Sequence, residues 1–498
     1  MKQTLVLWVL VLISGCAGID ENRERPQCSN NHGENVCSAL CSSSARQVSQ
    51  FGITWIFDRE YSVGRFVNGD WWVVGPVTIV SVRPAPGQAP PDEQREDYVN
   101  QFGDSCLQDD TTMRNGSMVV TNWGRYQGYD SGGKTYRRSE SIEFPYRLDT
   151  NRSLISSISH GSNLVNPKLV PFRQEVSRSL LKTAAVLTCL SEKPPKDAFR
   201  PPYVGTWKPI YRAGNLRREI LPNLPAVDQT PTFEEMERLV ERPWLDHVSS
   251  WMSCATAPNE NMPYYGREYA RAVSLVGLRL MVEAAPEEKE TLLIRFVQLG
   301  IDLYGLKKAG GRWQMGGGIT SGRKWPIVFA SVLLDDKEMQ NFPGASVFHE
   351  DQQTYYGVSW TGQTVLWQMG NHHGIAWPYE EKHPDKYNRQ DRRSSGYRVC
   401  CNATSWIGEA LGALLIGAKQ IWNHDAFFDY CDRWMTEPPT LYKEAGAPTA
   451  FMTKAVDAFV DNMYHTYRDS VPEQPGARNN MKWVWDDGGK WIKEANKP

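Results

Sequence analysis

The chain has 498 residues, which is enough for two or three domains. It carries 55 Lys and Arg residues against 57 Asp and Glu residues, so its formal net charge is −2. Proteins that bind nucleic acid need a basic surface, and this balance therefore excludes nucleic acid as an expected partner.

The N-terminal residues predict export and a lipid anchor. Lys2 precedes an apolar run at 5–13 that is too short to span a bilayer and is typical of a signal-peptide core. The run ends in Ile-Ser-Gly directly before Cys16. This ending resembles the lipobox of bacterial lipoproteins, which implies removal of the signal peptide 1–15 and acylation of Cys16 with fatty acids such as palmitate. The alternative is an ordinary signal peptide with a chance cysteine.

Ala17, rather than an aspartate, follows the lipidated cysteine. By resemblance to Gram-negative lipoproteins, this implies a position in the cell envelope at the outer membrane. No later segment is long and apolar enough for a transmembrane helix. Export also favours disulfides. The chain has 10 cysteines, and pairing is expected within a polar cluster or from it to a later cysteine: Cys28, Cys37, Cys41 and Cys106.

Residues 16–48 are rich in Ser, Asn and Glu and predict a polar tether. Residues 49–200 predict a mostly β domain resembling a β-sandwich, because short runs of β-branched and aromatic residues alternate with turn signals such as Asn68-Gly69-Asp70. A proline-rich linker is expected at 201–229.

Residues 230–470 predict a helical domain, because apolar residues recur at helical spacing in five separate stretches. The sequence Trp422-Asn423-His424-Asp425 predicts a tight turn between two of these helices, with Asn423 or Asp425 capping the second. Successive helix pairs predict an (α/α) toroid, or incomplete barrel, with function in the loops at one end. Residues 471–498 predict a polar tail.

Three loop clusters in the helical part carry residues suited to binding and catalysis. The first, at 259–268, contains Asn261, Tyr265 and Arg267; the second, at 310–325, contains Arg323 and Lys324; the third, at 370–398, contains Asn371, His372, His373, Arg393, Tyr397 and Arg398. The glycines of the second cluster are expected to let the backbone approach a ligand or another loop. That cluster lacks the Gly-Lys-Ser/Thr ending and the preceding strand of a phosphate loop.

The residue types of the third cluster suit β-elimination on a polymer of uronic acids. The reaction removes the proton at C5 and expels the 4-linked sugar, and it requires a group that neutralises the adjacent carboxylate. We expect Asn371, with help from Arg398, to do so. His372 is the expected base and Tyr397 the acid that protonates the leaving oxygen.

Second choices for these roles are His373, Tyr265 and Arg267. The basic residues of the three clusters are expected to line a groove for an acidic polysaccharide: Arg267, Arg323, Lys324, Arg393 and Arg398. The alternative is that they are ordinary surface and interface residues. Neither a cofactor nor a metal ion is expected at this site.

A family resemblance supports this interpretation. Asn371-His372, followed by an aromatic residue at Trp377, resembles the catalytic loop of alginate lyases built on helical toroids. Tyr397 and Arg398 then match the Tyr and Arg of the same tetrad. The resemblance covers residues 371–398 and implies the toroid fold and a lyase activity.

The chain departs from that family in three respects. His373 is additional, the matching Tyr and Arg are adjacent rather than separated, and the β domain precedes the helical domain. An inverting glycoside hydrolase is the alternative enzyme, with carboxylates to choose from at Glu268, Asp302, Glu350, Asp351 and Asp385. A third reading is a surface lipoprotein that binds glycans without catalysis. His349-Glu350-Asp351 is not expected to bind metal, because three adjacent side chains do not easily face one ion.

Overall fold

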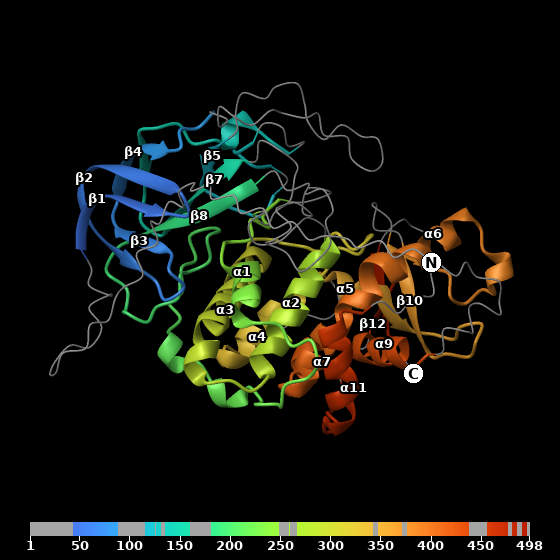
Figure 1. Ribbon diagram of the computed structural model, residues 1–498. Helices are drawn as coiled ribbons and strands as arrows, with labels where there is room; N and C mark the ends of the chain where they lie inside the picture. Colours follow the sequence, from blue (N-terminus) through green and yellow to red (C-terminus); the bar gives the residue numbers. More distant parts are fainter. Residues whose placement is uncertain are drawn as a thin grey trace, which may run out of the picture. The chain divides into compact units, whose positions relative to one another are not determined.

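A computed structural model describes residues 43–87, 115–124, 126–130, 135–159, 181–248, 258, 266–341, 347–370, 376–437, 456–476, 481–485 and 491–495. These residues form a mixed α and β structure, with a large sheet in the N-terminal part and most helices in the C-terminal part (Figure 1). The stretch Cys41–Pro498 is one compact unit. None of the described helices is long and apolar enough to cross a membrane.

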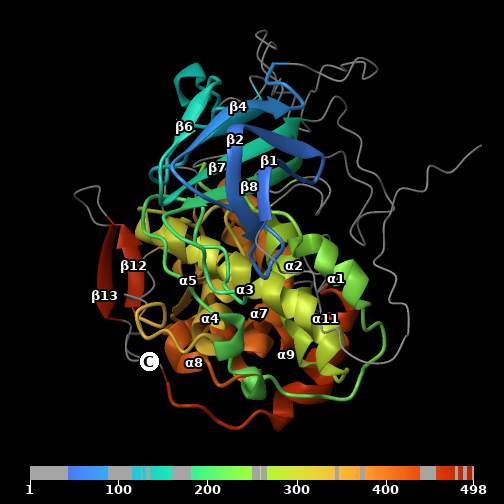
Figure 2. The same cartoon turned by 90° about the vertical axis from the view of Figure 1, so that its left-hand side faces the viewer.

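Eight strands form one curled mixed sheet (Figure 2). The strands are β1 (Ser43–Gln50), β2 (Ile53–Arg65), β3 (Trp71–Val74), β4 (Val77–Arg83), β5 (Gly116–Met118), β6 (Tyr146–Leu148), β7 (Arg152–Ser159) and β8 (Leu181–Leu190). Their order is β5-β7-β8-β3-β2-β4-β6, with β1 paired to β2, and only the β3–β8 pair is parallel among these strands. The β-rich runs were therefore predicted correctly, whereas two stacked sheets were expected and a single sheet is found.

The central strands are buried on both faces. On β8, Ala185 and Leu187 belong to a core formed within the sheet, whereas Ala184 and Val186 belong to the large core that the helices build. Neighbouring residues of a strand point to opposite faces, so a strand covered on both sides is apolar throughout. This accounts for the nearly continuous apolar run at 181–190.

The helices are α1 (Phe233–Val240), α2 (Gly266–Met281), α3 (Pro286–Lys308), α4 (Lys324–Leu333), α5 (His349–Gln353), α6 (Arg389–Tyr397), α7 (Ala403–Leu415), α8 (Lys419–Trp422), α9 (Asp425–Thr436) and α11 (Ala458–Tyr467). The longest, α3, begins at Pro286, with acidic residues in its first turn and basic residues in its last turn. This arrangement suits the fixed φ of proline and the helix dipole.

The helices pack closely where small residues face large ones. The indole of Trp325, on α4, lies between Gly277 of α2 and Gly412 of α7, where a Cβ atom would lie 2.4 and 2.8 Å from the ring. The predicted tight turn between α8 and α9 is confirmed. Asn423 adopts the left-handed conformation at φ 63°, and it ends α8 rather than capping α9.

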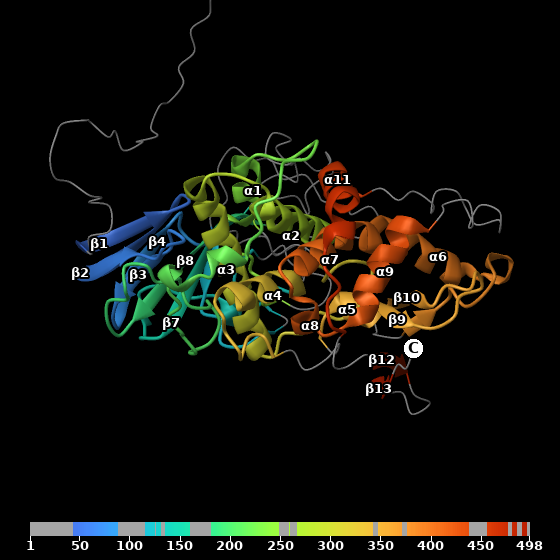
Figure 3. The ribbon, with the colours of Figure 1, turned by 90° about the horizontal axis from the view of Figure 1, so that it is seen from below.

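Two small sheets occur where only helices or a polar tail were predicted. One contains β9 (Thr354–Tyr356), β10 (Val365–Gly370) and β11 (Ala376–Pro378), and the other contains β12 (Met481–Trp485) and β13 (Trp491–Ala495). The β9–β11 sheet contacts α5, α6 and α9 (Figure 3). The region of the expected linker at 201–229 begins with buried residues, because Tyr203 and Val204 belong to the large core.

Candidate functional site

The glycine-rich loop between α3 and α4 lies against two other helices, α2 and α6. Gly318 and Gly322 adopt left-handed φ values of 87° and 85°, which favour glycine. A Cβ atom at Gly322 would lie 2.6 Å from Ala270 of α2, and one at Gly317 would lie 2.5 Å from the ring of Tyr397. The backbone of this loop therefore packs directly against the start of α2 and the end of α6.

Tyr397 and Arg393 lie on the same side of α6. The Tyr397 phenol is half-buried, and Arg393 is exposed. The Nη2 atom of Arg393 donates to the Tyr397 hydroxyl over 3.5 Å, and its guanidinium lies 5.5 Å from the ring centroid. The site thus offers a phenol and a cation together to an anionic ligand.

Arg398 lies inside the protein, next to Tyr397 in sequence. It donates to Glu380, which also accepts hydrogen bonds from Arg433 over 3.0 and 3.3 Å and from the backbone of Trp367 over 2.6 Å. Burial opposes ionisation of Glu380, yet Arg433 and Arg398 hold its pKa below the usual range. The charge of Arg398 is therefore compensated by an internal carboxylate, which differs from the expected contact with a substrate carboxylate.

Arg323 and Lys324 do not line the exposed groove that was expected from the sequence. Both side chains are buried at the start of α4. Arg323 binds both oxygens of Asp246, over 2.9 and 3.1 Å, and Lys324 donates to Asp351 over 2.5 Å. Burial lowers the pKa of Lys324. Since their charges are already paired in the interior, we assign these two residues a structural role.

Arg267 lies in the first turn of α2, where its Nε atom donates to Glu268 over 2.6 Å. Several predicted site residues lie outside the described residues: Asn261, Tyr265, Asn371, His372, His373 and the lipidation site Cys16. The cysteines of the expected disulfide cluster, Cys28, Cys37, Cys41 and Cys106, lie outside them as well.

The residues on either side of 371–375 are described and paired. Gly370 ends β10, Ala376 begins β11, and the two are opposite each other in the ladder. β10 contacts both α5 and α6. The chain therefore enters and leaves the Asn-His-His segment from a hairpin beside the helix that ends in Tyr397.

His349, Glu350 and Asp351 are all buried on α5 and face three different partners. The Nε2 atom of His349 lies 2.7 Å from Asn402, Glu350 accepts from the backbone of Gly322 over 2.5 Å, and Asp351 pairs with Lys324. Among the described residues, no group of three His, Cys, Asp or Glu side chains is arranged to hold a metal ion.

A second buried acid whose charge interacts with Glu350, Glu409, was not predicted from the sequence. Glu409 lies on α7, and neither of its carboxyl oxygens has a hydrogen-bond partner; Oε2 of Glu350 also has none. Burial, followed by the charge of Glu350, raises the pKa of Glu409 well above its ordinary value. Burial likewise raises the pKa of Glu350. No local pattern marks Glu409, because it sits among apolar residues of a core helix.

The carboxylates considered for a hydrolase are mostly committed to internal contacts. Glu268 pairs with Arg267, and Asp302 pairs with Arg200. Glu350 and Asp351 are buried. Asp385 has an exposed side chain, with one carboxylate oxygen 3.2 Å from Nδ1 of His383. These positions do not offer two opposed carboxylates on a shared open surface.

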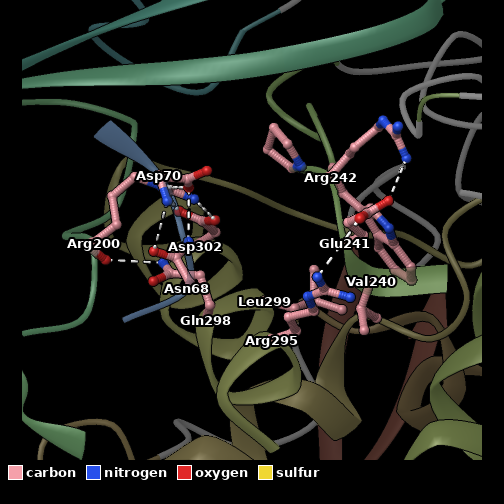
Figure 4. Close-up of a pocket in the computed structure, with 12 residues that line it drawn as sticks. Asn68, Asp70, Arg200, Val240, Glu241, Arg242, Arg295, Gln298, Leu299 and Asp302 are labelled. Atoms are coloured by element: carbon pink, nitrogen blue, oxygen red, sulfur yellow. Dashed lines mark hydrogen bonds and ion pairs between the residues drawn. The ribbon is translucent and has the colours of Figure 1, made fainter. Parts of the chain in front are cut away.

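A pocket lies where the β2–β3 turn meets α3 and the end of α1 (Figure 4). Arg200 lies on one side of it, between Asp70 and Asp302, and Arg295 and Glu241 lie on the other, 3.6 Å apart. The charges that line this pocket are paired with one another. These ion pairs connect the sheet to the helices. The pocket lacks the accessible phenol and cation found at Tyr397 and Arg393.

We compared the chain with protein-family models, with curated proteins and with solved structures, and none of the three comparisons gave a match.

Proposed function

We propose that this protein is a polysaccharide lyase that cleaves a uronic-acid-containing polysaccharide by β-elimination, on a helical part organised as an (α/α) toroid. The observation that carries the proposal is the phenol of Tyr397, half-buried against the backbone of Gly317 with the exposed Arg393 at its hydroxyl. A phenol can move a proton to or from a sugar, and an exposed guanidinium can pair with a uronate carboxylate.

The remaining roles follow the sequence prediction, with one change. Asn371 neutralises the uronate carboxylate and His372 removes the C5 proton, while Tyr397 protonates the leaving oxygen. Arg393 takes the place of Arg398 as the cation that meets the substrate, because Arg398 is paired with Glu380. The buried acids of the hydrolase alternative give that reading less support.

The direct test is incubation of the purified protein with a panel of acidic polysaccharides while the ultraviolet absorbance of unsaturated uronates is followed. A lyase raises this absorbance. A hydrolase releases reducing ends without it, and a glycan-binding protein produces neither. Either of the last two results contradicts the proposal.

Substitution of Tyr397 then tests the site. Tyr397→Phe removes only the hydroxyl, and loss of a general acid or base lowers the rate by about 10²–10⁴-fold. We expect that loss in kcat with binding nearly unchanged. Tyr146→Phe, at a half-buried tyrosine on β6 of the sheet, is the matched control and should keep full activity. Equal activity of the two variants excludes Tyr397 as the acid.

A further inference from the structure

The backbone just after Tyr397 departs from a regular α-helix. α6 ends at Tyr397, and Arg398–Asn402 form one turn of π-helix before α7 begins. Such turns are rare and are frequently found at functional sites. Asn402 has φ −130° and ψ −85°, so the helix breaks at this residue. Its side chain closes the turn, because Nδ2 donates to the carbonyl of Tyr397 over 2.9 Å.

Asn402 is itself held in place by a chain of hydrogen bonds. Its Oδ1 atom lies 2.7 Å from Nε2 of His349, and Nδ1 of His349 lies 3.0 Å from the Thr320 hydroxyl. Both His349 and Asn402 are fully buried, whereas Thr320 is half-buried in the glycine-rich loop. The carbonyl of Tyr397 is thus linked through α5 to the same loop whose Gly317 packs on the Tyr397 ring.

The hydrogen-bond partners of His349 show which nitrogen of its imidazole carries the hydrogen. Asn402 presents its oxygen to His349, since its nitrogen is used by Tyr397, and therefore Nε2 of His349 carries the hydrogen. Burial lowers the pKa of His349 to about 4, and the ring is neutral at physiological pH. The Thr320 hydroxyl lies 3.0 Å from Nδ1 and donates its hydrogen to the carbonyl of Gln314 over 2.7 Å. A side chain that supplies an N–H at the position of Nε2 can replace the hydrogen bond to Asn402, whereas an apolar side chain cannot.

We propose that His349 and Asn402 are positioning residues that fix the π-turn and thereby place the Tyr397 phenol. This inference rests on the proposed lyase function, in which Tyr397 acts on the substrate. Neither positioning residue reaches the substrate, because both side chains are fully buried. They act by holding the backbone from which Tyr397 projects, while Gly317 supports its ring from the loop.

The experiment places fluorotyrosine at position 397 of the full chain and records its ¹⁹F NMR signal together with kcat and KM. His349→Leu and Asn402→Leu should shift the signal and lower kcat by about 10²-fold with little change in KM, since small displacements of a catalytic group cost rate. His349→Gln supplies an amide N–H and should keep the wild-type signal and most of kcat. His465→Leu, at an exposed histidine of α11, is the matched control.

An unshifted signal in folded His349→Leu and Asn402→Leu overturns the inference. If these variants do not fold, Thr320→Val breaks the same chain at a half-buried position, and an unshifted signal there overturns it equally. A wild-type protein without lyase activity whose signal still depends on His349 refutes the proposed function and leaves the positioning role standing. If the wild type is an active lyase but kcat does not change in His349→Leu and Asn402→Leu, only the positioning role is refuted.

Discussion

Arg200 holds the carboxylate of Asp302 with both of its terminal nitrogens, over 2.9 Å from Nη1 and by a shorter bond from Nη2. Its Nε atom donates to Asp70 over 2.5 Å. Asp302 belongs to α3, and Asp70 directly precedes β3. One buried guanidinium therefore fastens the large sheet to the longest helix.

We expect Arg200→Met to destabilise the protein strongly, because it leaves two buried carboxylates without a counter-charge. Breaking such a buried pair costs about 3–5 kcal/mol. Chemical unfolding measures this as a lower free energy of unfolding. Arg212→Met is the control: Arg212 pairs with Asp197 at side-chain exposures of 54% and 30%, and exposed pairs contribute about 0–1 kcal/mol. Equal losses in the two variants contradict the role of Arg200.

The neighbouring glycines 316 and 317 give a sharp comparison. A Cβ atom at Gly317 would lie 2.5 Å from the Tyr397 ring, whereas one at Gly316 meets nothing within 4 Å. Gly317→Ala should displace the phenol and reduce lyase turnover by about 10²-fold, while Gly316→Ala should leave it unchanged. Steady-state kinetics on the polysaccharide found active would check this. Loss of activity in both variants would indicate a general effect on the loop.

The buried acid Glu409 makes stability depend on pH. Folded Glu409 keeps its proton to a higher pH than the unfolded chain does, because burial and Glu350 raise its pKa. The free energy of unfolding should therefore fall as pH rises above the ordinary carboxyl pKa, and level off above the folded-state pKa. Glu409→Gln cannot ionise and should flatten this slope. Glu143→Gln, at an exposed side chain, should not. Urea unfolding of both variants across this pH range measures the slope. Equal slopes in Glu409→Gln and Glu143→Gln would contradict the role of Glu409.

Arg393 should contribute to polymer binding through its charge. Arg393→Ala is expected to weaken binding of an acidic polysaccharide, most strongly at low salt, because exposed charges are screened as ionic strength rises. Binding isotherms at two salt concentrations provide the measurement. Arg138→Ala removes an exposed cation from the N-terminal β region and serves as the control. Tight, salt-insensitive binding of a neutral glucan would contradict an acidic substrate.

The lipid anchor predicted from the sequence can be tested at Cys16. Cys16→Ser removes the sulfur that the acyl group requires, so the variant should leave the membrane fraction or accumulate with its signal peptide uncut. Membrane fractionation and mass spectrometry of the N-terminus would show which. A variant that is processed and sedimented like the wild type would refute lipidation at this residue.

The sequence predicted the elements whose residues form local patterns. The alternating pattern of β2 and the turn at Asn423 can be read directly, because each depends on neighbours a few residues away. The β9–β11 sheet was missed because its strands are short and two of them have only three residues. A single sheet with both faces covered also gives the same strand patterns as a sandwich.

Tyr397 and Arg393 were singled out from the sequence as candidate residues of one loop cluster, and the structure places them in contact on α6. The burial of Arg398 and Arg323 was not predicted, because it depends on ion pairs with Glu380 and Asp246, which are not their neighbours in sequence. His349 and Asn402 are 53 residues apart and meet only in the folded chain.

The position of β8 in the large sheet has a consequence for the order in which the chain folds. β8 lies between β7 and β3, with Leu187 opposite Trp71, yet it is the last of the eight strands to be synthesised. Until it arrives, β3 and β7 each have an open edge, and open edges readily pair with other chains. Export N-terminus first, as the sequence predicts, would thus expose two aggregation-prone strand edges until residue 190 has emerged.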